Sequence, residues 1–152
     1  MSYTAGEALI LTRLQAISGS VWTSANTARG KWTQLNGGAS DHYAVLKMGA
    51  GMNDGFALSA TRRHYTTVIE VWQSYLDDGS SYTNMLAFWE AILDTFDQYR
   101  LLGDSTGTVQ DARCTRWDAV EERWVKGGNG PRWLKQNFYI EWWEENAVTY
   151  AE

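Results

Sequence analysis

The chain has 152 residues, of which 44% are hydrophobic and 20% charged, and it contains a single proline. This composition is typical of a globular protein and not of a disordered chain, so residues 1–152 are predicted to form one domain. The 13 Lys and Arg against 18 Asp and Glu give a net charge of −5. That balance argues against a protein that binds nucleic acid through a basic surface.

The cysteine content and the first residues bear on location. The lone Cys114 cannot form a disulfide within the chain. Residues 1–7 lack the basic and apolar regions of a signal peptide, and no apolar run approaches the ~20 residues that span a bilayer. We therefore expect a protein that matures in a reducing cytoplasm and is not an integral membrane protein.

The first half of the chain predicts one helix and then a strand. Thr4 is expected as the N-cap, with Glu7 at the capping-box spacing, and the helix is expected to end near Ser18. Residues 22–41 are polar and turn-rich, and residues 42–48 have the composition of a strand.

The glycine-rich segment 49–56 has no periodicity, so it is predicted as a long loop or a hairpin tip, where functional residues are common. Its candidate interface residues are Met52, Asn53, Asp54 and Phe56.

A long strand over residues 62–75 and the closing strand of the chain both carry apolar side chains on two faces. A sheet with helices on one side would leave Trp72, Tyr139 and Trp143 on the other side. With nine Trp, eight Tyr and four Phe, one small core cannot easily bury every ring, and aromatic residues are enriched at interfaces. These three rings are candidate contacts between subunits; the alternatives are a second core layer or isolated surface rings.

The second predicted helix shows the clearest pattern, starting at Ser80 or Ser81 and ending at Gly103. Apolar residues at helical spacing are expected to face the core: Tyr82, Met85, Leu86, Trp89, Ile92, Leu93, Phe96 and Tyr99.

Strands are expected over residues 108–115 and 119–125, followed by a tight turn over 126–131. Asn129 and Arg132, at this turn, complete the candidate interface residues. The predicted fold is α+β, an α/β sandwich. Its mixed, mostly antiparallel sheet carries two main helices on one face, in the order helix, strands, helix, strands, with long loops.

Residue types that perform catalysis do not form a recognisable site. His42 follows Ser40 and Asp41, but three consecutive residues do not fold back into a nucleophile, a base and an orienting group. There is no metal-ligand spacing of Cys and His, no phosphate-binding glycine loop and no nucleophile elbow. We therefore predict no catalytic, cofactor or metal site, and a protein that is not an enzyme.

The order of elements, together with residues 25–32, 40–46 and 68–78, resembles the tail terminator and tail-completion proteins of long-tailed bacteriophages. The resemblance implies an α/β subunit of a hexameric ring, assembled in the host cytoplasm, at the neck of the virion. Such a ring ends growth of the tail tube and joins the tail to the head, with tail tube protein and head-closure or connector protein as partners. Genome DNA passes through its lumen without specific binding.

Two alternatives remain at this point. A head-closure or head-to-tail joining protein would share the ring geometry and the acidic charge. A small cytoplasmic enzyme or ligand-binding domain would instead have a cleft between the sheet and residues 49–61, lined by His64, Tyr65 and Trp72.

Overall fold

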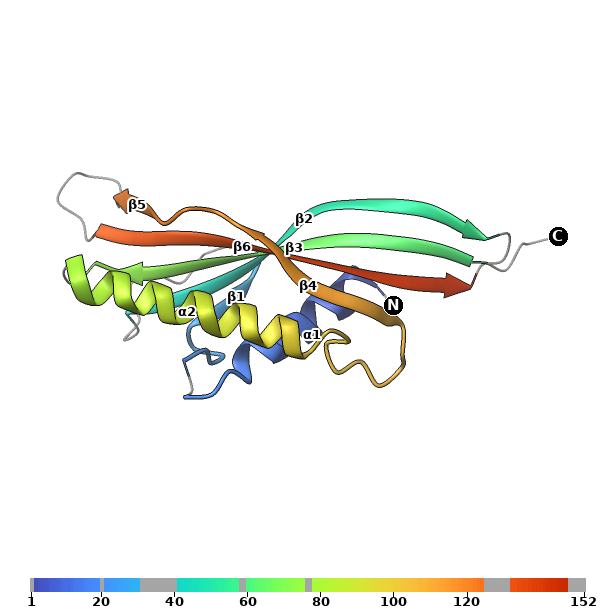
Figure 1. The fold of residues 1–152 in the computed structure, drawn as a ribbon, viewed down its shortest axis with the longest axis horizontal. Coiled ribbons are helices and arrows are strands. Elements are labelled where there is room, and N and C mark those ends of the chain that lie inside the picture. Colours follow the sequence, from blue (N-terminus) through green and yellow to red (C-terminus); the bar gives the residue numbers. More distant parts are fainter. Residues whose placement is uncertain are drawn as a thin grey trace.

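The computed structural model describes residues 2–19, 21–30, 41–57, 60–75, 78–124 and 132–147. Two helices lie on one face of a six-stranded sheet (Figure 1). In chain order the elements are α1 (Tyr3–Gln15), β1 (Thr27–Arg29), β2 (His42–Ala57), β3 (Ala60–Ser74), α2 (Asp78–Gln98), β4 (Val109–Trp117), β5 (Glu121–Trp124) and β6 (Arg132–Ala147). The predicted α+β class and the order helix, strands, helix, strands are confirmed.

The sheet is built around three long strands. Its order is β1-β2-β3-β6-β4, with β5 paired to the opposite end of β6 from β4. Only β1 and β2 are parallel among the described pairs, and the others are antiparallel. β6 therefore sits between β3 and the later part of the chain, and it carries residues to both ends of the sheet.

The prediction of a loop at residues 49–56 is wrong, because this segment continues β2. Gly51 pairs with Tyr65, Met52 with His64 and Gly55 with Thr61. A bulge between Met48 and Gly51 shifts the register of the β2–β3 pairing. The hydrogen bonds of a β-ladder use backbone groups, which glycine supplies as well as other residues do. Pairing with β3 therefore fixes residues 49–56 in an extended conformation, although their side chains show no strand periodicity.

The first helix begins earlier than predicted and is shorter. Ser2, not Thr4, is the N-cap, and its Oγ accepts a hydrogen bond from the Ala5 amide at 3.3 Å. α1 ends at Gln15. Ile10 and Leu14 are fully buried, as their spacing predicted.

The second helix begins at Asp78, before Ser80, and ends at Gln98, five residues before Gly103. Its core stripe differs from the predicted one: Met85, Phe88, Ile92 and Phe96 are buried. Tyr82, Leu86 and Tyr99 are instead exposed. Within the described ranges, neither helix combines the length and hydrophobicity that a bilayer crossing requires.

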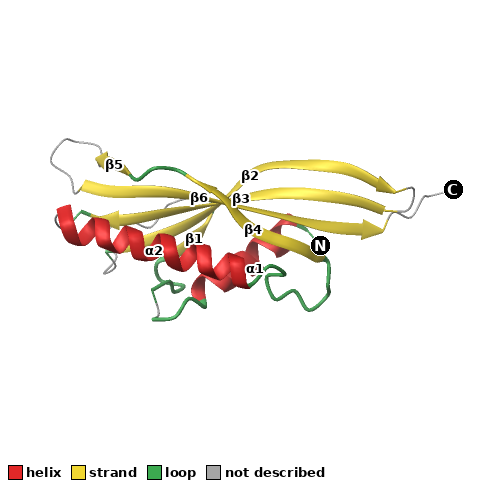
Figure 2. Cartoon of the chain, in the orientation of Figure 1, coloured by secondary structure: helices red, strands yellow, loops and turns green. Residues whose placement is uncertain are grey.

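The core lies between the helices and one face of the sheet (Figure 2). β3 contributes Ile69 and Val71, and β6 contributes Phe138, Ile140 and Trp142. The predicted alternation of side chains between the two faces of the sheet is confirmed for β3 and β6. The predicted turn at residues 126–131, including Asn129, lies outside the described residues.

Candidate interaction surfaces

One face of the sheet has no helix on it in the described structure, and we call it the open face (Figure 2). Tyr3 of α1 packs against Tyr65 and Trp142, which places those two residues on the helix side. Neighbours along each strand point the other way. The three predicted rings, Trp72, Tyr139 and Trp143, therefore lie on the open face, each partly exposed.

The centre of the open face is a charge cluster. The Glu70 carboxylate lies 2.7 Å from Lys47 Nζ on β2 and 3.0 Å from Lys135 Nζ on β6. Burial raises the pKa of Glu70, but the hydrogen bonds and charges of the two lysines outweigh it and hold the pKa below its ordinary value. Lys135 also lies over the Trp72 ring, 5.4 Å from its centroid. Trp72 is thus bordered by positive charge.

Tyr139 forms a second cluster beside it. The Arg116 guanidinium lies 3.9 Å from the Tyr139 ring centroid. The Tyr139 hydroxyl donates to Asp118 Oδ2 at 2.9 Å, and Asn137 Nδ2 donates to the same oxygen at 2.8 Å. The aromatic ring is therefore held in a fixed orientation, with an exposed cation above it.

Trp143 lies near the end of the sheet at which β2 and β3 meet. The Arg62 guanidinium stacks on its ring at 4.3 Å and is paired with Glu145 at 3.2 Å. Met52 and Trp143 both line a hollow of about 480 Å³ in the sheet surface. Asn53 is exposed next to Met52.

The remaining candidate residues are spread out. Arg132 begins β6 at the opposite end of the sheet and stacks over Tyr75 at 5.3 Å. Asp54 and Phe56 belong to β2, where Asp54 pairs with Arg62 and Phe56 falls at the register shift between Gly55 and Ala57. The candidates are thus spread along the sheet, with Tyr139 midway in register between Trp72 and Trp143, and they do not form one compact site.

A second surface was missed by sequence reasoning. A groove of about 620 Å³ runs between α2 and the β4–β5 connection. Its exposed apolar residues include Tyr82, Leu86 and Trp117, which are 52%, 45% and 44% exposed. Trp117 meets Trp89 edge to face, with ring centroids 5.5 Å apart. The sequence feature that indicates this groove is the apolar stripe of α2, which is too wide to be buried entirely against the sheet.

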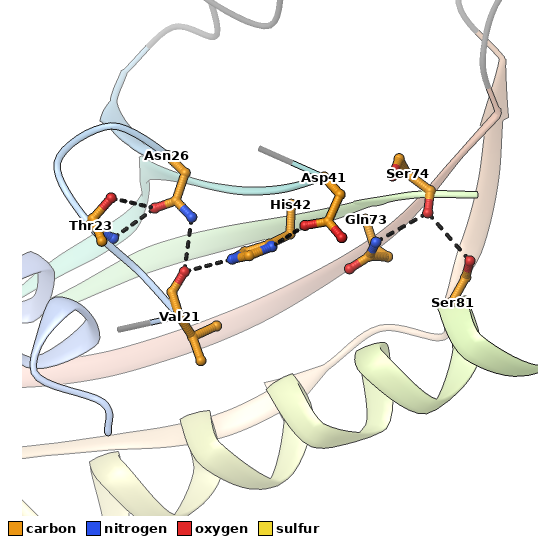
Figure 3. A network of polar contacts seen from close by, with 8 residues as sticks. All are labelled: Val21, Thr23, Asn26, Asp41, His42, Gln73, Ser74 and Ser81. Atoms are coloured by element: carbon orange, nitrogen blue, oxygen red, sulfur yellow. Dashed lines mark hydrogen bonds and ion pairs between the residues drawn. The ribbon is translucent and has the colours of Figure 1, made fainter. Parts of the chain in front are cut away.

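The Ser40-Asp41-His42 segment does not present a free base in this arrangement. Figure 3 shows His42 between Asp41 and the Val21 carbonyl, with Nδ1 and Nε2 each 2.6 Å from an oxygen. Each ring nitrogen thus lies within hydrogen-bond distance of a protein oxygen, so the ring is occupied by contacts within the chain. His42 ties the segment before β1 to the start of β2, while Ser40 lies outside the described residues. Within the described ranges, no three His, Cys, Asp or Glu side chains gather as a metal site.

The alternative cleft lined by His64, Tyr65 and Trp72 is found only in part: His64 and Tyr65 line the hollow of about 480 Å³ beside Met52, but Trp72 does not. Tyr65 faces α1, whereas His64 lies on the open face beside Trp143. Trp72 is eight residues further along the same strand, or about 26 Å at 3.3 Å per residue. The three side chains therefore do not converge.

Comparison with solved structures extends the description of the fold. A chain of the "Virion of native gene transfer agent (GTA) particle" has a TM-score of 0.55 at 15% identity, covering 95% of this chain and 100% of that chain. A second solved chain aligns with 100% of this chain and 99% of its own length at 14% identity, with a TM-score of 0.45. No family model and no curated protein matches the chain. At 15% identity, the likeness to the virion chain shows a shared fold.

Proposed function

We propose that this protein is a structural component of a phage-like virion that forms a ring at the head-proximal end of the tail tube. In this role it stops tail polymerisation and joins the tail to the head. The observation that carries the proposal is the fold likeness to a chain of a gene transfer agent virion, which extends over almost the whole of both chains.

The surfaces support an assembly role. The open face carries aromatic rings under cations, and the α2 groove carries exposed Tyr82, Leu86 and Trp117 on the other side of the sheet. Such apolar surfaces on a single domain favour contacts with other proteins. The net charge of −5 suits a lumen through which DNA passes without being held.

The test is the tail-length distribution, by negative-stain microscopy, in lysates of the parent virus with this gene deleted. A terminator predicts overlong tails without heads, because nothing ends addition of tube subunits. Complementation with the wild-type gene should restore the normal length. Tails of normal length beside unjoined or leaking heads would instead support a head-closure protein.

A further inference from the structure

The α2 groove is lined mainly by apolar side chains, which come from α2 and from the connection between β4 and β5. These side chains are Tyr82, Met85, Leu86, Trp89, Trp117 and Val120. Tyr82, Leu86 and Trp117 keep 52%, 45% and 44% of their surface exposed. Exposed apolar side chains gathered in one hollow of about 620 Å³ are typical of a surface that another protein covers.

The charged side chains around the α2 groove are mostly acidic. Residues 78–98 contain no Lys or Arg, and Glu90 is exposed one helical turn after Leu86. Glu122 is exposed on β5, and its pairing with the core residue Leu134 places its side chain on the helix side of the sheet. Asp118 lines the groove itself.

The described cations at this end of the sheet, where α2 begins and β5 pairs with β6, lie away from the groove (Figure 1). Three of them lie on the open face: Arg116, Arg123 and Lys135. Arg132 is on the helix side, where it stacks over Tyr75. Gln136, the groove residue on the same strand, is four positions further on, or about 13 Å at 3.3 Å per residue. Among the described residues, the charges nearest the groove are therefore carboxylates.

The spacing of the groove residues suits a helix as the partner. Tyr82 and Leu86 are one turn apart, and Trp89 lies about 10 Å along α2 from Tyr82 at 1.5 Å per residue. Apolar side chains at positions i, i+4 and i+7 of a second helix repeat over the same length. Basic residues beside that apolar stripe would meet Glu90 and Glu122.

A second copy of this chain does not offer such a helix within the described ranges. α2 has no cation, and α1 has only Arg13, whose Nε donates to the Leu102 carbonyl at 3.0 Å. The apolar face of α1 is already covered, because Ile10 and Leu14 are fully buried. A partner with this chemistry is therefore a different protein.

We propose that the α2 groove binds a basic amphipathic helix of another protein. The apolar side chains of that helix fill the groove between Leu86 and Trp117, and its Lys or Arg side chains pair with Glu90 and Glu122. The inference stands on the groove alone and does not rest on the proposed role in a virion.

The test uses a synthetic helical peptide of about 14 residues with a stripe of Leu on one face and Lys on the other, the Lys peptide. Fluorescence anisotropy of the labelled peptide measures its Kd for the full-length protein at about 0.15 M salt. One control peptide has the same composition with the Leu stripe scrambled. A second control, the Glu peptide, keeps the stripe but has Glu in place of Lys. Each control should bind at least about tenfold more weakly than the Lys peptide.

Reversing the charges beside the groove should switch the preference between the two striped peptides. Glu90→Lys/Glu122→Lys should bind the Glu peptide about tenfold more tightly than the Lys peptide, because the signs are exchanged. Glu121→Lys/Glu141→Lys makes the same change of net charge at two exposed residues of the open face, and should keep the wild-type preference. Leu86→Ser should weaken binding of the Lys peptide about tenfold, because an apolar contact is lost.

Circular dichroism and urea unfolding identify a variant that does not fold. Glu90→Gln/Glu122→Gln then replaces the reversal, and should weaken binding of the Lys peptide without switching the preference. The proposal is overturned if the wild type does not bind the Lys peptide, or binds the three peptides equally. It is also overturned if the open-face reversal switches the preference as well, since net charge alone then explains the binding.

Sedimentation velocity of the protein without peptide tests the other occupant of the groove. Self-association that Leu86→Ser abolishes would mean that a second copy covers the groove, and would overturn the proposal. The expected result is that Leu86→Ser leaves the oligomeric state of the protein unchanged.

Discussion

The indole ring of Trp142 in β6 lies directly against Gly6 of α1. A Cβ added at residue 6 would come within 2.1 Å of the Trp142 Cη2 atom. Trp142 is fully buried, and its Nε1 donates to Thr67 Oγ1 at 3.2 Å. The absence of a side chain at residue 6 therefore sets how closely α1 approaches the sheet.

Gly6→Ala should destabilise the protein. Alanine in a helix interior normally stabilises by about 0.5–1 kcal/mol relative to glycine. Here the added methyl overlaps a packed ring, so we expect a net loss of about 1–3 kcal/mol in the free energy of unfolding. Urea unfolding measures it. The double variant Gly6→Ala/Trp142→Leu should show a smaller loss than the two single changes added together, and stabilisation by Gly6→Ala alone would contradict the close contact.

Trp142 and Trp143 are consecutive residues with different environments, and this gives a matched pair of variants. Trp142→Ala empties a core site and should cost about 3–5 kcal/mol. Trp143 is only partly buried on the open face, so Trp143→Ala should cost about 1 kcal/mol. Urea unfolding compares the two. Equal losses would place the Trp143 ring in the core and make its assignment to an interface wrong.

The faces of the long strands could be predicted from sequence because the side-chain period of a strand is two. The alternation around Ile69, Phe138 and Trp142 needed no knowledge of the partner strands. The extent of β2 could not be predicted, since Gly49, Gly51 and Gly55 are turn residues by local preference. Pairing with β3, a long-range contact, overrode that preference.

Sequence alternation predicted the open-face part of the candidate surfaces but not the α2 groove. Trp72, Tyr139 and Trp143 were placed on the open face by alternation alone. The α2 groove depends on the contact between Trp117 of β4 and Trp89 of α2, which lie 28 positions apart in the sequence. A local sequence pattern cannot predict a contact between residues so far apart. The helix period located an apolar stripe, but it could not tell which part of a wide stripe the sheet would cover.

Glu70 should make stability depend on pH. Its pKa is lowered in the folded protein, so its contribution is fully present above the ordinary pKa near 4.5 and is lost as the pH falls below that value. Glu70→Gln should cost about 1–3 kcal/mol at pH 7, because Lys135 loses its carboxylate partner. The difference between the variant and the wild type should shrink as the pH falls from 4.5 through the lowered pKa of the folded carboxylate. Thermal unfolding across that range measures it, with Glu90→Gln controlling for loss of one carboxylate.

Cys114 should react slowly with alkylating reagents while the protein is folded. Burial raises the pKa of its thiol to about 11, from an ordinary 9.0. The thiolate is the reactive form, so at pH 8 the folded protein should react about 100-fold more slowly than the urea-unfolded protein. Iodoacetamide labelling followed by mass spectrometry measures both rates. The less stable Gly6→Ala variant should react faster than the wild type under native conditions, because it unfolds more often. Equal rates in buffer and in urea would mean that Cys114 is open to solvent in the folded state.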